Sequence, residues 1–336
     1  MSPPLSLATM SSHSSFYNII PGALAEELQV YAVCLKRDRP LWIQHPHITD
    51  NITLLSVPST EETDAIVETF NTIDDEVLII PHGSFVRYLS KKDLEKIRHP
   101  IFGGTKILSY EAIRQKNSGL LKKAGLQTPK VFSSIDEIDR PVIIKLHGAE
   151  GGKGYFVAES KKEVKEKQTT EDSIDFIQEY ISGVSIYAHY FSSPILERCE
   201  LLGFDRRLES NVNAQHLTDF DEPSFTVVGN VPIVVRESLV PEYQRIGEAF
   251  VDHTGIVGPF CIETICTPEL AIYAFEFSGR IVAGTTVWVP HGSTYANVLW
   301  GEEMYMGKRI AREIKLAMKK KETDKLFIDS PKLQEV

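Results

Sequence analysis

The sequence predicts an α/β domain with a parallel sheet, followed by a longer α+β region rich in antiparallel strands. Up to residue 100, short apolar strand-like runs alternate with helix-like runs, an order typical of parallel sheets. Beyond residue 129, two β-rich stretches, 130–160 and 176–290, are separated by one short charged segment. Residues 100–105 read as a connector. We therefore expect two domains, residues 1–101 and residues 102–336.

The N-terminal region carries three predicted strands and one predicted helix. The strands are apolar runs that end at polar or turn residues, namely Gln29–Leu35, Asn51–Leu55 and Val77–Ile80. The helix, Glu61–Phe70, has amphipathic spacing. Ligands of parallel sheets gather at the carboxyl ends of the strands, so Pro81–Phe85, which follows the third strand, is a candidate site.

Three further segments have helical or charged patterns. Tyr110–Ala124 is predicted to be a helix, with Gly125 as its C-cap. The charge run Lys161–Lys167 is predicted to be a solvated helix or loop rather than a basic binding patch. A last helix, Gly307–Met318, is followed by three lysines whose positive charges suit its C-terminal dipole.

The composition excludes several classes of protein. The 336 residues carry a net charge of −10 and are 42% hydrophobic, which excludes disorder for most of the chain and disfavours nucleic acid as the main partner. No uninterrupted apolar run approaches the ~20 residues of a membrane helix. The start lacks the pattern of a secretory signal, so we expect a cytoplasmic protein that does not bind membranes. The four cysteines, without a CxxC pair, are expected to be reduced and packed in the core.

The most specific local motif is the glycine-rich loop His147–Gly154. Successive glycines let backbone N–H groups close around phosphate oxygens. Predicted strands flank the loop on both sides, whereas a Walker loop or a Rossmann fingerprint needs a following helix. The pattern predicts a hairpin that closes over a triphosphate, with Lys145 at its base and Lys153 at its tip. The alternative for Lys145 is a strand-end lysine that points to water.

A pair of acids has the spacing of a metal site. Glu263 and Glu276 each lie on an apolar strand, and a turn joins the two strands, so we expect an antiparallel hairpin with both carboxylates on one face. Two desolvated carboxylates repel each other unless a cation lies between them, and such hard oxygen ligands suit Mg²⁺. Ser278 follows on the same face, and Arg280 is placed to contact a phosphoryl oxygen. The alternative is a surface ladder of acids and arginine.

The order of these motifs resembles the ATP-grasp superfamily, in which ATP lies between two α+β subdomains. Within it, the chain resembles the archaeal family of 5-formaminoimidazole-4-carboxamide ribonucleotide synthetases. The resemblance spans nearly the whole chain and is carried by Ser12–Ser14, Pro81–Phe85, Gly148–Phe156, Leu201–Asn211, Val227–Pro232, Gly258–Cys261 and Arg309–Lys315. It implies a pre-ATP-grasp domain at residues 1–101 and an ATP-grasp domain at residues 102–336, with a hinge near 178–184.

The resemblance also implies a reaction and a set of site residues. The reaction joins formate to the amine of 5-aminoimidazole-4-carboxamide ribonucleotide (AICAR), through formyl phosphate, and gives the formamide FAICAR, ADP and phosphate. ATP would contact Lys145, Gly148, Gly151, Gly152, Lys153, Gly154, Gln178, Glu179, Tyr180, Ile181 and Glu209. AICAR would contact His13, Ser84 and Asn230, Mg²⁺ or Mn²⁺ would bind Glu263 and Glu276, and Arg280 with Lys145 would act in catalysis. Members of the family assemble into trimers or hexamers, which implies a homo-oligomer.

Three positions depart from the pattern of the family: Leu24, Gly104–Thr105 and Thr286. They leave open a paralogous ligase with retained ATP chemistry and a different acceptor. A further alternative is a non-catalytic ATP-binding subunit. Such a subunit would lack one of the metal-binding acids or the lysine at the base of the glycine hairpin.

Three assignments keep alternatives at this stage. His13 either caps a helix or binds the ribonucleotide phosphate as an imidazolium. Ser84 is either a phosphate donor or an ordinary turn serine. Either Lys106 or Lys116 is a second lysine at the phosphates.

Overall fold

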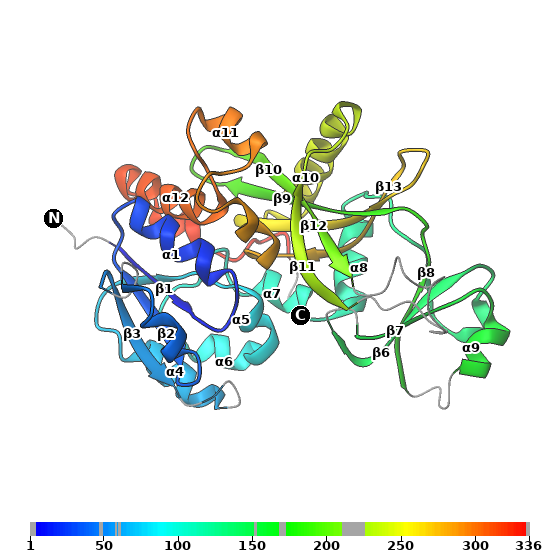
Figure 1. The fold of residues 1–336 in the computed structure, drawn as a ribbon, viewed down its shortest axis with the longest axis horizontal. Coiled ribbons are helices and arrows are strands. Elements are labelled where there is room, and N and C mark those ends of the chain that lie inside the picture. The colour runs from blue at the N-terminus through cyan, green and yellow to red at the C-terminus, as the bar shows by residue number, and fades with distance from the viewer. Residues whose placement is uncertain are drawn as a thin grey trace.

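The computed structural model describes residues 5–46, 50–57, 59, 62–150, 153–167, 173–209 and 226–333. The strands of these residues form three sheets that follow one another along the longest axis of the molecule (Figure 1). In the same described residues, every helix is too short or too polar to cross a bilayer.

The first sheet is parallel, as the sequence predicts, with strand order β3-β2-β1-β4. Its strands are β1 (Ser6–Met10), β2 (Val30–Leu35), β3 (Ile52–Val57) and β4 (Val77–Ile79). Its helices are α1 (Phe16–Ala25), α2 (Arg39–Trp42), α4 (Thr63–Asn71), α5 (Gly83–Tyr88) and α6 (Lys91–Lys96). The sequence prediction lacked β1, which pairs with both β2 and β4, because a short strand that is buried on both faces has no polar alternation.

The predicted single helix at 110–124 is wrong, since two helices occupy this region. They are α7 (Lys106–Glu111) and α8 (Arg114–Lys123), and Ile113 between them is extended, at φ −119° and ψ 111°. The break lets each helix contact the same strand end. Glu111 accepts a hydrogen bond from the Gly279 backbone N–H at 2.8 Å, and Asn117 accepts one from the Phe277 N–H at 3.0 Å.

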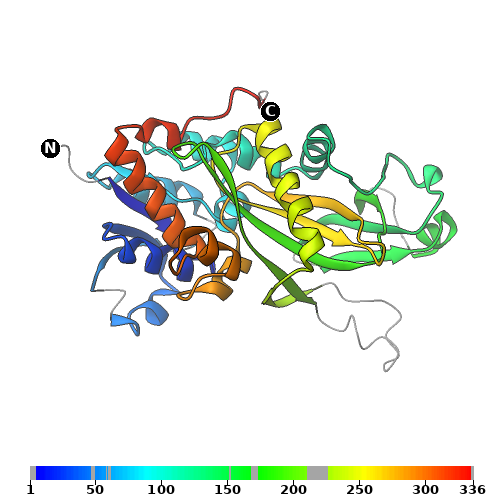
Figure 2. The same cartoon turned by 90° about the horizontal axis from the view of Figure 1, so that it is seen from above.

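The second sheet is antiparallel and has the order β11-β10-β9-β12-β13 in the described residues. Its strands are β9 (Val184–Ser193), β10 (Arg198–Glu209), β11 (Val227–Ile233), β12 (Gly258–Cys266) and β13 (Ile272–Ser278). Helix α10 (Val240–Thr254), after the short 3₁₀ helix η4 (Glu237–Leu239), covers one face of the sheet (Figure 2). Phe250 of α10 packs on Phe260 of β12, with ring centroids 5.6 Å apart. The predicted β-rich stretch 176–290 missed α10, although Pro241 and the left-handed Gly255 mark its two ends.

The third sheet is small and has the order β5-β8-β6-β7 in the described residues. Its elements are β5 (Val131–Phe132), η1 (Ile135–Glu137), β6 (Val142–Glu150), β7 (Lys153–Ala158), α9 (Lys161–Lys167) and β8 (Ile174–Glu179). Strands β6 and β7 form an antiparallel hairpin with Glu150 opposite Lys153, so the predicted strand–loop–strand is confirmed. Gly151 and Gly152 lie outside the described residues. The charge run is the largely exposed helix α9, as predicted.

The C-terminal segment returns to the first sheet. It consists of η5 (Ala283–Trp288), α11 (Thr294–Trp300), α12 (Met306–Lys320) and η6 (Thr323–Leu326). Helix α12, predicted as 307–318, lies beside α1 in both views (Figures 1 and 2). A Cβ on Gly22 would lie 2.1 Å from the carbonyl carbon of Gly307, so the backbones of α1 and α12 touch. The domain boundary at residue 101 stays a prediction.

This contact gives the first testable prediction. We expect Gly307→Ala to lower the free energy of unfolding by about 2 kcal/mol, because its Cβ would lie 1.9 Å from the carbonyl oxygen of Asn18 and force the helices apart. The matched control is Gly119→Ala in α8, where nothing lies within 4 Å of the new Cβ. Helix propensity alone makes the control more stable, by about 0.5–1 kcal/mol. Urea unfolding measures both changes, and a Gly307 variant as stable as its control would contradict the predicted contact.

Candidate active site

A cavity of about 330 Å³ lies between the small sheet and the five-stranded sheet. It is lined by most of the residues that the sequence assigns to ATP and metal, namely Lys145, Gln178, Glu179, Tyr180, Ile181, Glu209, Glu263 and Glu276. Gly148, Lys153 and Gly154 belong to the β6–β7 hairpin. Segments far apart in the sequence therefore meet at one cavity.

One row of polar residues crosses the face of the five-stranded sheet that α10 does not cover. Directly opposed residues of an antiparallel sheet point to the same side. Asp205 is opposite Tyr187, Tyr187 is opposite Glu263, and Glu263 is opposite Glu276. The two acids therefore face each other across the β12–β13 hairpin, as the sequence predicts.

The environment of Glu263 opposes its negative charge. Burial and the neighbouring charge of Glu276 raise the pKa of Glu263 to about 8. The hydroxyl of Ser278 donates to Glu263 Oε1 at 3.5 Å, which agrees with the predicted position of Ser278 on the same face. A cation between the two acids would stabilise both of them in the ionised form.

Lys145 is a buried cation at the base of the hairpin. Only 5% of the residue is exposed, so the alternative of a lysine that points to water is wrong. Its Nζ lies 5.4 Å from the ring centroid of Tyr155 and 5.7 Å from that of Phe176. Burial lowers the pKa of Lys145, while the charges of Glu276 and Glu263 act in the opposite direction. The ammonium group therefore lies in an apolar surrounding beside the two acids.

At the predicted hinge, which begins at the end of β8, side chains rather than the backbone N–H groups of Glu179 and Tyr180 are available to a ligand. The backbone N–H groups of Glu179 and Tyr180 already donate to Lys130 and Pro141, at 2.8 and 2.9 Å. The Glu179 carboxylate accepts from the Lys130 backbone and from Arg140. Gln178 is buried, and its Nε2 has no hydrogen-bond partner among the described residues. The Gln178 amide is therefore a donor on the cavity wall that a ligand can satisfy.

The predicted acceptor residues of the first domain lie together. The His13 ring stacks on the ring of His82, with centroids 5.0 Å apart and 15° between the planes. The Ser84 hydroxyl donates to the Ser12 carbonyl at 3.3 Å. A Cβ on Gly83 would lie 2.7 Å from His13 Nε2, so this close approach requires glycine.

Asn230 joins this region through Arg207. Asn230 lies opposite Arg207 in the β10–β11 pair, and its buried Oδ1 has no hydrogen-bond partner among the described residues. The charge of Arg207 in turn lowers the pKa of His13. Arg207, to which the sequence analysis assigned no role, therefore connects the two sides of the site.

His13 lies two residues before Ser15, the N-cap of α1, and this helix start has no side-chain capping hydrogen bond, so the predicted helix cap is wrong. Its Nδ1 accepts from the Ser15 backbone N–H at 3.1 Å. Burial, helped by the charges of Arg280 and Arg207, lowers the pKa of His13 to about 4. His13 is therefore neutral at pH 7 in the ligand-free protein, in contrast to the imidazolium that the sequence analysis considered.

The lowered pKa gives a second prediction. An unfolded histidine titrates near pH 6.5, so between pH 6.5 and 4 His13 is protonated in the unfolded chain but neutral in the folded protein. Stability is therefore lost as the pH falls through this window. Between pH 7 and pH 4, we expect the free energy of unfolding of wild type to fall by about 3 kcal/mol more than that of His13→Asn. Urea unfolding at a series of pH values tests this, and parallel curves for the two proteins would contradict it.

Arg280 is held away from the cavity wall by a partner that the sequence analysis missed. Its Nη2 lies 2.7 Å from Oε1 of Glu111, a buried acid on α7. Burial raises the pKa of Glu111, and Arg280 acts against this rise. The two residues are far apart in the sequence, and no motif around Glu111 indicates the pair. Arg280 nevertheless lies close enough to Glu263 to lower the pKa of that acid.

Neither candidate for a second phosphate lysine lines the cavity. Lys116 lines a separate cavity of about 580 Å³ beside α5 and α6. Lys106 starts α7, and its backbone N–H donates to Asp329 at 2.8 Å. Arg206 and Arg207 are the further cations on the wall of the first cavity.

The three departures from the family pattern have different surroundings. Leu24 packs against the apolar cluster around α1 and α12. Gly104, at φ +77°, and Thr105 contact Asp329, so this connector is held by the C-terminal segment. Thr286 donates to the carbonyl oxygen of Ser14 at 3.2 Å, next to His13. Of the three, Thr286 is the one beside the predicted acceptor residues.

Comparisons with known proteins agree with this geometry. A family model described as a protein of unknown function (DUF1246) matches residues 7–132, and a domain of unknown function (DUF1297) matches residues 156–327. The 5-formaminoimidazole-4-carboxamide-1-(beta)-D-ribofuranosyl 5'-monophosphate synthetase of Ignicoccus hospitalis is 39% identical, over 99% of this chain and 95% of the relative. The synthetase of the same name from Saccharolobus solfataricus is 40% identical, over 96% and 98%.

Solved structures are also similar to this chain. The IMP biosynthesis protein PurP from Thermococcus kodakaraensis superposes with a TM-score of 0.76 and 27% identity, over 95% of this chain and 99% of that one. An ADP complex of N5-carboxyaminoimidazole ribonucleotide synthetase superposes with a TM-score of 0.65 and 15% identity, over 91% and 80%. This second likeness concerns the fold alone.

Proposed function

Because the chain belongs to the 5-formaminoimidazole-4-carboxamide-1-(beta)-D-ribofuranosyl 5'-monophosphate synthetase family and has the ATP-grasp fold, we propose that it is an ADP-forming ligase that joins formate to AICAR. The products are FAICAR, ADP and phosphate. The observation that carries this proposal is the single cavity lined by Lys145, Glu263 and Glu276 in a chain so similar to these synthetases. The presence of all three residues disfavours the alternative of a non-catalytic ATP-binding subunit.

The reaction needs two transfers. A formate oxygen attacks the γ-phosphorus of ATP, the bond from that phosphorus to the bridging oxygen breaks, and ADP leaves. The amine nitrogen of AICAR then attacks the carbon of formyl phosphate, the carbon–oxygen bond to phosphate breaks, and the nitrogen loses a proton. Lys145, buried beside the acids, would neutralise charge on the transferred phosphoryl group. The β6–β7 hairpin would exclude water, which otherwise hydrolyses formyl phosphate.

The two acids fit a divalent cation. Glu263 and Glu276 are opposed oxygen donors, and the raised pKa of Glu263 indicates negative charge that lacks a counter-ion. The described residues contain no group of three or more His, Cys, Asp or Glu side chains that could hold a metal, so further ligands would come from phosphate or water. Mg²⁺, or Mn²⁺, held by Glu263 and Glu276 would neutralise developing charge on the phosphates.

The substrates are assigned to the two sides of the site. ATP would lie between the small sheet and the five-stranded sheet, on Gln178, Tyr180, Ile181 and Glu209, with the β6–β7 hairpin above it. AICAR would lie toward the first sheet, on His13, Ser84 and Asn230. The stacked histidines and the unpartnered Oδ1 of Asn230 support this side for the acceptor.

A paralogous ligase with a different amine acceptor is the second candidate. It is favoured by one observation, the contact of Thr286 with the Ser14 carbonyl beside His13, because Thr286 departs from the family pattern. This departure lies on the acceptor side, whereas Lys145 and the two acids are intact.

Turnover of the full chain tests both candidates. With ATP, Mg²⁺, formate and AICAR we expect FAICAR, ADP and phosphate in equal amounts, and no FAICAR when AICAR or formate is left out. Chromatography of the nucleotides and a phosphate assay measure these products. Phosphate release that requires another amine would overturn the first candidate and support the second.

We also propose a homo-oligomer, a trimer or hexamer, and a cytoplasmic location, from the family resemblance. Charged nucleotide substrates do not cross membranes unaided, which supports the location. Light scattering tests the assembly, since the chain has a mass of 37.8 kDa and a monomer of that mass would contradict it.

A further inference from the structure

We propose that Arg207 binds the carboxylate of formate and that the buried pair of His189 and Asp205 holds its guanidinium in position. The inference rests on the proposed function, because it names the group that recognises the small acid. The sequence analysis assigned no role to any of the three residues.

Arg207 lies where the small acid has to bind. In the proposed reaction, formate lies between the phosphate of ATP and the amine of the acceptor. Arg207 lines the cavity together with Glu263, lies opposite Asn230 in the sheet, and is close enough to His13 to lower the pKa of that histidine. It therefore adjoins both the acids and the predicted acceptor residues.

The guanidinium of Arg207 is held on two sides. It lies over the ring of Tyr187, 4.2 Å from the centroid. Its Nε lies 3.2 Å from Oδ2 of Asp205, an ion-pair contact outside hydrogen-bond geometry, and 15% of the side chain is exposed. A planar guanidinium fixed in this way can present its donors to a carboxylate in a bidentate manner, which an ammonium cannot do.

The pair behind Arg207 is completely buried. His189 Nε2 and Asp205 Oδ1 are 2.5 Å apart, and both side chains are 0% exposed. The pair is closely packed, since a Cβ on Gly284 would lie 2.3 Å from Asp205 Oδ1 and the rings of His189 and Trp288 lie nearly perpendicular, with centroids 5.2 Å apart. A buried carboxylate is costly unless it is paired. Asp205 is paired on one side with His189 and on the other with Arg207, so it fixes the arginine to the sheet.

The other cations of the site are occupied or lie elsewhere. Lys145 belongs to the small sheet and is surrounded by aromatic rings beside Glu276. Arg280 is paired with Glu111 and does not line the cavity. Arg206 also lines the cavity and is exposed, but it alternates with Arg207 along β10 and therefore lies on the other face of the sheet from the row of polar residues. Among the described residues, Arg207 is thus the cation on the wall between the acids and the acceptor side.

Steady-state kinetics of the full chain test the inference. We expect Arg207→Met to raise the KM for formate by about 100-fold, the value of a charge-assisted bidentate contact, with the KM for ATP nearly unchanged. Arg207→Lys restores part of the loss. Asp205→Asn raises the KM for formate by about 10-fold. Arg245→Met, an exposed arginine on α10, is the control and keeps the KM for formate of wild type.

A double variant distinguishes positioning from a merely structural role. If Asp205 acts through Arg207, Asp205→Asn combined with Arg207→Met binds formate no more weakly than Arg207→Met alone. Effects that multiply would overturn the positioning role. Thermal unfolding of each variant checks the fold, and Arg207→Lys decides the outcome if Arg207→Met does not fold.

The outcomes separate the inference from the proposed function. If wild type formylates AICAR and Arg207→Met keeps its KM for formate, or raises the KM for ATP equally, the inference is wrong and the proposed function stands. If wild type turns over only with another carboxylate, formate is wrong as the substrate, and the KM for that carboxylate then decides whether Arg207 binds it. If no carboxylate supports turnover of wild type, both are wrong.

Discussion

Replacement of Glu276 by glutamine abolishes ADP formation, with kcat lowered at least about 1000-fold, while the fold remains intact. A factor of this size corresponds to about 4 kcal/mol of transition-state stabilisation. Glutamine keeps the shape of the side chain but removes one of the two charges that would bind the cation between β12 and β13. Assay of ADP and FAICAR with ATP, Mg²⁺, formate and AICAR measures the loss.

The same substitution leaves the ligand-free protein folded, with a free energy of unfolding close to that of wild type. Removal of the Glu276 charge relieves its repulsion with Glu263 but also removes its attraction to buried Lys145, so the two effects oppose each other. Loss of activity together with retained stability excludes unfolding as the cause. Glu269→Gln is the matched control, since it removes the same charge from the exposed turn between the two strands and should keep full activity. Turnover of Glu276→Gln within tenfold of wild type would mean that the assignment of the metal site is wrong.

The spacing of residues in the sequence predicted the acids and the hairpin because these are local features. A turn between two apolar strands fixes their pairing, and the pairing brings Glu263 opposite Glu276. The same reasoning predicted the β6–β7 hairpin with Lys145 at its base. The ATP-grasp fold and the family followed from the order of such motifs, and the comparisons confirm them.

Contacts between distant segments could not be predicted in this way. Glu111 and Arg280 form an ion pair across the packing of α7 on the end of β13, and neither has a local pattern that points to the other. The pairing of Arg207 with Asp205 and His189 depends on the register of β9 and β10. The break at Ile113 accompanies the contacts that the two helices make with the end of β13, and no local pattern indicates these contacts.

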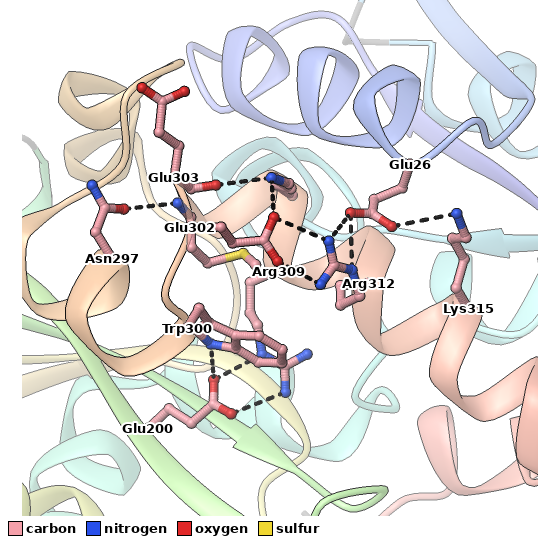
Figure 3. A network of polar contacts seen from close by, with 11 residues as sticks. Glu26, Glu200, Asn297, Trp300, Glu302, Glu303, Arg309, Arg312 and Lys315 are labelled. Carbon is pink, nitrogen blue, oxygen red and sulfur yellow. Dashed lines mark hydrogen bonds and ion pairs between the residues drawn. The ribbon is translucent and has the colours of Figure 1, made fainter.

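Arg309 gives the largest expected effect on stability. It lies in the network of polar contacts between α12, α11 and β10 (Figure 3). Its Nε donates to Glu200 at 2.7 Å and its Nη1 to Glu313 at 2.7 Å, and all three side chains are almost completely buried. The guanidinium also lies 4.0 Å from the ring centroid of Phe191. Arg309 therefore compensates Glu313 and shares the compensation of Glu200 with Arg198, which is more exposed.

We expect Arg309→Met to lower the free energy of unfolding by about 3–5 kcal/mol, because it leaves buried Glu313 without its cation and leaves buried Glu200 with the more exposed Arg198 alone. Arg312→Met, which removes a more exposed arginine one turn away, should cost about 1 kcal/mol or less, since Lys315 still lies near Glu26. Adding Glu200→Gln and Glu313→Gln to Arg309→Met should recover most of the loss, because the uncompensated charges are then gone. Urea unfolding measures the free energy of unfolding of wild type, Arg309→Met, Arg312→Met and the triple variant. Equal stability of Arg309→Met and Arg312→Met, or no recovery in the triple variant, would show that uncompensated charge is not what destabilises the protein.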